Sequence, residues 1–210
     1  MLTQLRQHLA QHQAQSSYFK LPQAGVCLLI TQSDQPEIIF TQRAAHLSSH
    51  SGQVAFPGGK RDPQDADILA TALRETHEEI GLAPEKIQVL GRLSDVISLH
   101  GLKVTPFVGL IAADLDLHPC EAEIASVFQV PLAYFAQDPR QRTDLIYVGE
   151  QAYYVPSYLY QGYEIWGLSA MMLVELLALA YQRDFNVLTP PKATCPLWVR
   201  PKRAFTHQKA

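Results

Sequence analysis

The sequence lacks several features that would assign it to a specialised class of protein. Its three cysteines, Cys27, Cys120 and Cys195, are odd in number and far apart, and no CxxC pair occurs. Because this is not the spacing of a zinc site or a redox pair, we expect idle thiols in a reducing cytosol. The net charge of −3 results from 17 basic and 20 acidic residues. Since neither sign dominates, we expect no nucleic acid partner.

Long apolar runs are also missing. The first 20 residues are rich in glutamine and histidine and contain no apolar stretch of the signal-peptide type. The most apolar segment, residues 165–181, is interrupted by Gly167, Ser169 and Glu175. It falls short of the roughly 18 to 20 apolar residues that a membrane-spanning helix needs. We therefore expect a cytoplasmic protein without a membrane partner, in which residues 165–181 form a buried core helix.

The length and apolar content predict one domain with extensions at both ends. The chain has 210 residues, of which 47% are apolar, so it can bury a substantial core. We predict a polar arm or helix over residues 1–20, a domain over residues 21–183, and an extended, proline-rich tail over residues 184–210.

Patterns of apolar residues predict the main elements of the domain. Two β-branched runs, residues 24–31 and 37–42, are separated by turn residues and predict a hairpin. Between residues 67 and 80, apolar residues recur with the period of a helix. This predicts a helix with Asp67 as its N-cap and Gly81 at its C-terminal end. Residues 131–137 predict a short helical turn. Further strands are predicted at 87–98, 103–112, 125–130, 144–149 and 152–160.

The order of these elements indicates the fold class. Strands precede, separate and follow two helices without regular alternation, which favours a mixed sheet packed between helices. The expected class is α+β, as an α/β/α sandwich. Between the first hairpin and the first helix, the sequence turns to Ser, His and Gly and ends in Phe56-Pro57-Gly58-Gly59. We predict a functional loop there that continues no regular element.

Three glutamates on the predicted helix are the main candidates for chemistry. Residues three and four apart on a helix are neighbours, so Glu75 lies beside Glu78 and Glu79. Arg74 relieves only part of their repulsion, and the stripe favours a cation. Oxygen ligands without thiolates favour Mg²⁺ or Mn²⁺. The alternative is a solvated helix face, because charged clusters on exposed helices are common.

The glutamates stand in a longer motif. The segment from Gly58 to Leu82 reads GGKRDPQDADILATALRETHEEIGL, and it resembles the Nudix box, G-x5-E-x7-R-E-U-x-E-E-x-G-U with U apolar. The match covers the positions Arg74, Glu75, Glu78, Glu79, Gly81 and Leu82. The interval before Arg74 is one residue longer than in the standard box, and Ala66 stands where its first glutamate falls. Thr76 replaces an apolar residue. Asp65 and Asp67 are the candidates to hold the loop in place of the missing glutamate.

Sequence outside the box is similar to the coenzyme A pyrophosphatase branch of the Nudix superfamily. Thr41-Gln42-Arg43-Ala44, Gly52 and residues 56–59 match that branch, as do residues 127–132 and 165–170. Ser48 stands where the branch has a second arginine. The resemblance covers roughly residues 24–180 and implies hydrolysis of the diphosphate of coenzyme A or its derivatives, giving 3′-phospho-AMP and 4′-phosphopantetheine.

The resemblance also implies roles for individual residues. Glu75, Glu78 and Glu79 would hold Mg²⁺ or Mn²⁺, and the general base would be Glu79 or Glu123. The substrate-binding candidates are Arg43, Gly58, Gly59 and Lys60. The expected partner is a small-molecule diphosphate, and a homodimer stays open. Two alternatives remain: a Nudix pyrophosphatase acting on a nucleotide sugar such as ADP-ribose or on a dinucleotide, and a non-catalytic nucleotide-binding regulator.

Overall fold

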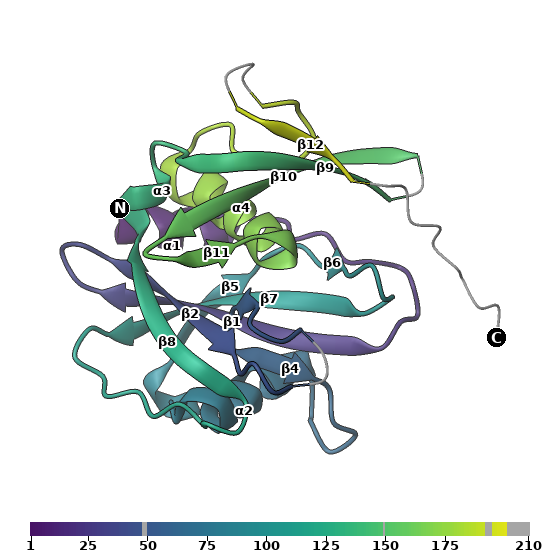
Figure 1. The fold of residues 1–210 in the computed structure, drawn as a ribbon. Helices are drawn as coiled ribbons and strands as arrows, with labels where there is room; N and C mark the ends of the chain where they lie inside the picture. Colours follow the sequence, from purple (N-terminus) through teal and green to yellow (C-terminus); the bar gives the residue numbers. More distant parts are fainter. Residues whose placement is uncertain (48–49, 149, 192–194, 201–210) are drawn as a thin grey trace.

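The computed structural model describes residues 1–47, 50–148, 150–191 and 195–200. Over these residues the chain forms two β-sheets with helices packed on them (Figure 1). Helix α2 covers one face of the main sheet, and helices α1 and α4 lie between its other face and the second sheet. This layered arrangement of mixed sheet and helices confirms the α+β class.

The main sheet is mixed because one of its strand pairs is parallel. Strands β1 and β7 run parallel over their full length, with Gln23 opposite Lys103 and Gln32 opposite Ala112. The remaining pairs are antiparallel, including the predicted hairpin of β1 and β2. The central path is β3 (Val54–Ala55), β2 (Glu37–Arg43), β1 (Gln23–Gln32), β7 (Lys103–Ala112) and β5 (Gln88–Arg92). Off this path, β4 (Gly58–Lys60) pairs with β1, β6 (Val96–Ile97) with β7, and β8 (Ile124–Pro131) with β2.

The second sheet contains the second predicted hairpin and part of the tail. Its strand order is β11 (Tyr163–Ile165), β10 (Gln151–Tyr160), β9 (Arg140–Val148) and β12 (Leu197–Val199). Strand β12 lies in the segment predicted as an extended tail and pairs in parallel with β9. Of the tail, residues 192–194 and 201–210 lie outside the described part. The division into arm, domain and tail stays a prediction.

Helix α2 (Ile68–Ile80) has the predicted ends and packs closely on the main sheet. The carboxylate of Asp67 accepts the N–H of Ala70 at 2.8 Å, and Gly81 closes the helix in the left-handed conformation. A Cβ on Gly25 of β1 would lie 2.5 Å from the carbonyl oxygen of Ile68. A glycine in β1 therefore lets the helix lie directly on the strand.

The other helices form the layer between the sheets. Helix α4 (Gly167–Tyr181) confirms the predicted core helix, although Ile165 belongs to β11 and Trp166 is the N-cap. Helix α1 (Leu2–Gln11) buries Leu5 and Leu9 in the same core. Two short turns, α3 (Leu132–Phe135) and the 3-10 turn η1 (Pro84–Lys86), complete the fold. Among the described residues, no helix is long and apolar enough to cross a membrane.

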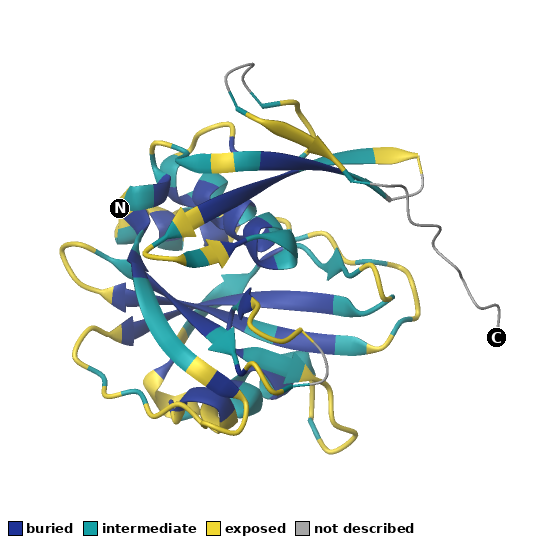
Figure 2. Ribbon diagram, viewed as in Figure 1, coloured by how far each residue is buried: buried dark blue, intermediate teal, exposed yellow. Residues whose placement is uncertain are grey.

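The prediction that the stretch ending in Gly58-Gly59 continues no regular element was wrong. Residues Gly58–Lys60 form strand β4, which pairs antiparallel with β1 and places Gly59 opposite Gly25. A Cβ on Gly58 would lie 2.3 Å from the carbonyl oxygen of Gly25, and the φ of Gly58 is +145°. The glycines that mark a loop in the sequence are here the residues that let a strand approach closely. Figure 2 shows the central strands buried and the loops around them exposed.

Candidate active site

The three glutamates of α2 differ widely in their exposure to solvent. The side chain of Glu79 is 5% exposed, that of Glu75 is 19% exposed, and that of Glu78 is 55% exposed. The first two carboxylates lie under strand β4, and the third faces solvent at the rim. An ordinary solvated helix face would leave all three exposed, so this alternative does not describe Glu75 and Glu79.

Glu79 is a buried carboxylate with two partners from other elements. Its Oε2 accepts the backbone N–H of Gly58 at 3.0 Å, and Nη1 of Arg43 lies 3.7 Å from its Oε1. Burial raises the pKa of Glu79 to about 7, and the neighbouring carboxylates of Glu75 and Glu123 add to this, while Gly58 and Arg43 oppose it. Burial therefore favours the protonated form of Glu79 more strongly than Gly58 and Arg43 favour the ionised form.

Glu75 lies directly against Gly59, which belongs both to the Nudix segment and to β4. A Cβ on Gly59 would lie 2.3 Å from Oε2 of Glu75. Burial raises the pKa of Glu75 as well, although the adjacent Arg74 guanidinium opposes the shift. The absence of a side chain at Gly59 allows backbone and carboxylate to meet at this point.

Arg74 connects the glutamates to the loop that precedes α2. Its Nε and Nη2 donate to the two carboxylate oxygens of Asp65 at 2.9 and 3.1 Å. Its Nη1 donates to Glu78 at 2.8 Å, and Nη2 donates to Glu75 at 3.0 Å. Nη2 also lies 3.3 Å from the carbonyl oxygen of Lys60 in β4. One guanidinium thus orients two of the three glutamates.

The structure assigns the loop-holding role to Asp65 and the capping role to Asp67. Besides Arg74, the Asp65 carboxylate accepts the hydroxyl of Thr71 at 2.8 Å and the N–H of Asp62 at 2.9 Å. The hydrogen bonds from Arg74 hold the pKa of Asp65 well below its usual range. The sequence offered both Asp65 and Asp67 for holding this loop. Asp65 holds it, and Asp67 caps α2 instead.

Arg43 lies at the site, at an irregularity in strand pairing. The pairing of β2 with β8 shifts register between Gln42 and Arg43, and such irregularities re-aim side chains at the ends of strands. The backbone of Arg43 is held by a hydrogen bond from its N–H to the carbonyl oxygen of Gln53 at 3.0 Å. Nε of Arg43 is buried and has no hydrogen-bond partner among the described residues. This leaves a donor for a ligand next to Glu79.

Glu123 is brought to the same place by a loop that caps α2. The N–H groups of His118 and Cys120 donate to the carbonyl oxygens of Ile80 and Glu79, both at 2.9 Å. The N–H of Ala44 donates to the carbonyl oxygen of Glu123 at 2.8 Å. The exposed carboxylate of Glu123 is near enough to raise the pKa of both Glu75 and Glu79.

Two contacts of the site were not predicted from the sequence. Nε2 of His46 lies 3.0 Å from the carbonyl oxygen of Ala122, beside Glu123. The second contact is made by the loop containing His118, whose backbone N–H groups cap the C-terminal end of α2. A lone histidine or a backbone amide carries no pattern in one sequence, so nothing indicated either contact in advance.

Of the substrate-binding candidates, Arg43, Gly58 and Gly59 lie against the glutamates, and Lys60 is exposed at the end of β4. Ser48 lies outside the described residues.

Within the part of the chain that the structure describes, no three His, Cys, Asp or Glu side chains are placed to hold a metal ion. The donor set of three carboxylates nevertheless fits a hard cation such as Mg²⁺ or Mn²⁺. The buried, poorly neutralised Glu79 fits one as well.

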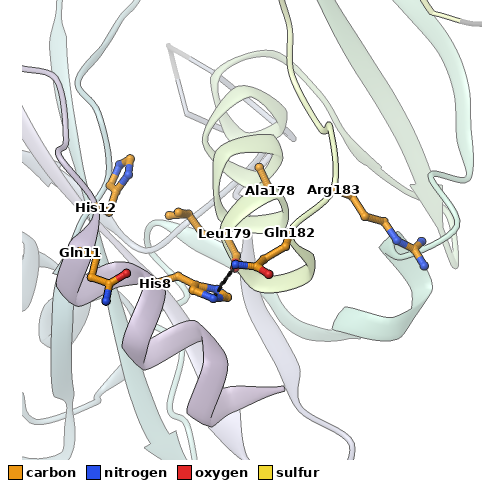
Figure 3. Close-up of a pocket in the computed structure, with 7 residues that line it drawn as sticks. All are labelled: His8, Gln11, His12, Ala178, Leu179, Gln182 and Arg183. Carbon is orange, nitrogen blue, oxygen red and sulfur yellow. Dashed lines mark hydrogen bonds between the residues drawn. The ribbon is translucent and has the colours of Figure 1, made fainter.

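Two cavities differ in their relation to this site. One of about 190 Å³ adjoins the box and is lined by Asp62, Gln64, Asp65, Arg74 and Glu78. The other, of about 440 Å³, lies between α1 and α4 (Figure 3) and is lined by His8, Gln11, His12, Ala178, Leu179, Gln182 and Arg183. The main sheet separates it from α2, and His8 is already bonded to Leu179 and Gln182. The larger cavity is therefore not the place of the glutamate chemistry.

Comparison with known families agrees with this geometry. Residues 21–144 match the model of the NUDIX domain family, and this span includes all three glutamates, Arg43 and Glu123. The chain belongs to the Nudix hydrolases, which act on phosphorus-containing anhydrides and generally use divalent metal ions.

The chain is similar to two bacterial proteins that carry the name uncharacterized Nudix hydrolase NudL. It is 44% identical to the one from Photorhabdus laumondii over 154 residues, covering 73% of this chain and 82% of that protein. It is 41% identical to the one from Enterobacter sp. strain 638, covering 73% and 80%.

Two solved structures are similar to the chain at lower sequence identity. The Nudix hydrolase RenU of M. smegmatis is 24% identical, with a TM-score of 0.46 over 57% of this chain and 76% of that one. The C. elegans Ap4A hydrolase is 18% identical, with a TM-score of 0.45 over 52% and 80%.

Proposed function

We propose that the protein hydrolyses the diphosphate bond of coenzyme A or its derivatives, giving 3′-phospho-AMP and 4′-phosphopantetheine or its acylated form. The observation that carries the proposal is the meeting of Arg43, Gly58 and Glu79. Arg43 and Gly58 come from the segment similar to the coenzyme A pyrophosphatase branch, and Glu79 comes from the box. Two separate motifs thus converge on one buried carboxylate.

The residues have distinct roles in this proposal. Glu75, Glu78 and Glu79 would hold Mg²⁺ or Mn²⁺, which supplies neutralisation of the diphosphate charge and activation of water. Arg43 is only loosely paired with Glu79, at 3.7 Å, and its guanidinium can turn its fork to a phosphate oxygen. In this proposal the backbone of Gly58 and Gly59 borders the diphosphate, with Glu75 and Glu79 directly against it, and Lys60 adds positive charge at the strand end.

The general base is proposed to be Glu123, with Glu79 as the alternative. Glu123 is exposed, and its loop is fixed to α2 and β2 by backbone hydrogen bonds. A carboxylate that faces solvent beside the metal-binding glutamates can accept the proton of the attacking water. Glu79 is the better choice for metal binding because Gly58 fixes its orientation.

The second candidate is a pyrophosphatase that acts on ADP-ribose or on a dinucleotide. It is favoured by Ser48, which stands where the coenzyme A branch has a basic residue. A non-catalytic regulator is less well supported because all three glutamates of the box are present. We further propose a small-molecule partner and a cytoplasmic location. A reducing cytosol suits the three unpaired cysteines. Whether the protein is a monomer or a homodimer stays open.

A substrate panel tests the proposal. The purified chain is incubated with Mg²⁺ or Mn²⁺ and either coenzyme A, ADP-ribose or a dinucleoside polyphosphate, and the products are identified by mass spectrometry. We expect the highest kcat/KM for coenzyme A and the appearance of 3′-phospho-AMP. Much faster hydrolysis of ADP-ribose or of the dinucleotide would agree with diphosphate hydrolysis but contradict coenzyme A as the substrate.

A further inference from the structure

Two basic residues, Arg61 and Lys103, flank Gln23 at one end of the main sheet. Lys103, the first residue of β7, is the register partner of Gln23 in β1. On the other side of β1, the N–H of Arg61 donates to the carbonyl oxygen of Gln23 at 2.9 Å. The three residues therefore form one row across neighbouring strands. Adjacent strands are about 4.8 Å apart, so the backbones of Arg61 and Lys103 are separated by about 10 Å.

This row lies on the same face of the sheet as the glutamates. Gly59 is opposite Gly25, two residues along from the row, and residues two apart on a strand share a face. Glu75 lies directly against Gly59. Arg61 is thus about 7 Å from Gly59 along the chain of β4, and Lys103 lies about 10 Å further to the side, beyond β1.

The positive charges of this row are not neutralised by carboxylates of the described residues. Within the described part of the chain, neither Arg61 nor Lys103 takes part in an ion pair. Nη2 of Arg61 contacts the carbonyl oxygen of Asp65 at 3.3 Å, while the Asp65 carboxylate is occupied by Arg74. Arg61 is exposed and Lys103 is half-buried, so both can meet a ligand from solvent.

We infer that Arg61 and Lys103 bind a phosphomonoester on the ribose of the substrate, beside the diphosphate that the glutamates receive. Both side chains are suited to phosphate, Arg as a planar fork and Lys as a point charge. Their position on the same face of the sheet as the glutamates, together with the absence of ion pairs among the described residues, selects diphosphates that carry this extra anionic group. This inference rests on the proposed function, because it names the substrate class of that same site.

The kinetic test compares coenzyme A with 3′-dephospho-coenzyme A, which differ only in the phosphomonoester. The wild type is expected to prefer coenzyme A in kcat/KM, and Lys103→Gln and Arg61→Gln each to reduce this preference by about tenfold, mainly through KM. The matched control is Lys86→Gln on η1. Gln88 of β5, two residues after Lys86, pairs with Leu110, which is seven residues, or about 23 Å, along β7 from Lys103.

A binding measurement separates failure of this inference from failure of the proposed function. Calorimetric titration with adenosine 3′,5′-bisphosphate and with AMP needs no turnover. Tighter binding of the bisphosphate that is lost in Lys103→Gln and kept in Lys86→Gln supports the inference even if coenzyme A is not hydrolysed. Equal binding of the two nucleotides by the wild type overturns it. An unchanged preference in both basic-row variants also overturns it.

Discussion

Single residues at the site differ in what they contribute to chemistry and to stability. Glu78 is largely exposed and bonded to Arg74, while Glu79 is buried and bonded to Gly58. Substitution of the exposed glutamate therefore perturbs the fold least. Among the glycines, Gly58 packs against backbone, and Gly59 packs against the end of a side chain. These contrasts allow the function to be tested separately from folding.

Replacement of Glu78 is expected to reduce catalysis while leaving stability almost unchanged. Loss of one metal-binding carboxylate removes several kcal/mol of transition-state stabilisation, so kcat in Glu78→Gln should fall by about 100-fold or more. Activity with saturating Mg²⁺ or Mn²⁺ and a thermal melt measure the two effects. Glu85→Gln, an exposed residue on η1, is the control and should keep full activity. An active Glu78→Gln enzyme would remove Glu78 from the metal site.

The two glycines of the box should respond differently to alanine. In Gly59→Ala the new Cβ would meet the end of the Glu75 side chain, so the carboxylate is displaced, activity is lost and the melting temperature falls little. In Gly58→Ala the Cβ would meet the backbone of Gly25, and φ is +145°. We expect that variant to lose about 1–3 kcal/mol of stability. Equal melting temperatures with equal activities would contradict the packing described.

At the scale of elements, α2 and β4 form one structural unit at the candidate site. Helix α2 supplies the three glutamates, and β4 supplies the glycine backbone against which two of them lie. The loop between them is held by the ion pair of Asp65 with Arg74. The position of the carboxylates thus depends on a contact made outside the helix.

Removal of the Asp65 charge should destabilise the protein at neutral pH and less so in acid. Arg74 lowers the folded-state pKa of Asp65, so the ionised aspartate contributes stability above its unfolded pKa of about 4. That contribution is lost as the pH falls through the folded pKa. Denaturant melts of wild type and Asp65→Asn across pH should therefore converge on acidification. Asp62→Asn, an exposed neighbour in the same loop, is the control. A difference that does not depend on pH would argue against the ion pair.

At the scale of the whole molecule, two sheets share one core through α4. The core joins residues from the main sheet, from β10 and from α1. The N-terminal segment, expected to be an arm or a helix, inserts Leu5 and Leu9 into this core, and Leu5 is fully buried. Stability of the Nudix domain therefore depends on residues that precede the matched family segment.

Truncation of Leu5 tests this dependence. Leu5→Ala creates a cavity beneath α1 and is expected to cost about 2–5 kcal/mol of unfolding free energy. Chemical denaturation measures the change, and Gln7→Ala on the exposed face of the same helix should be nearly neutral. If Leu5→Ala matches the wild type, α1 does not belong to the cooperative core.

Local interactions allowed the sequence by itself to determine a large part of this protein. Helix α2 has both its caps and its apolar period within 15 residues of chain, and the predicted helix from Asp67 to Gly81 is confirmed. The hairpin of β1 and β2 is equally local, because turn residues lie between two apolar runs. The three glutamates of α2 could be proposed from the sequence for the same reason, since their spacing on one helix is a property of the chain.

Only the tertiary structure decided what depends on residues far apart in the sequence. Strand β4 was missed because its partner in β1 lies more than 30 residues away and its glycines imitate a loop. Strand β12 was missed because it pairs with β9, some 50 residues earlier. The choice of Asp65 over Asp67, and the burial of Glu79 beneath Gly58, likewise arise from packing. Spacing along a helix places the carboxylates together, and contacts across the fold set their charge and orientation.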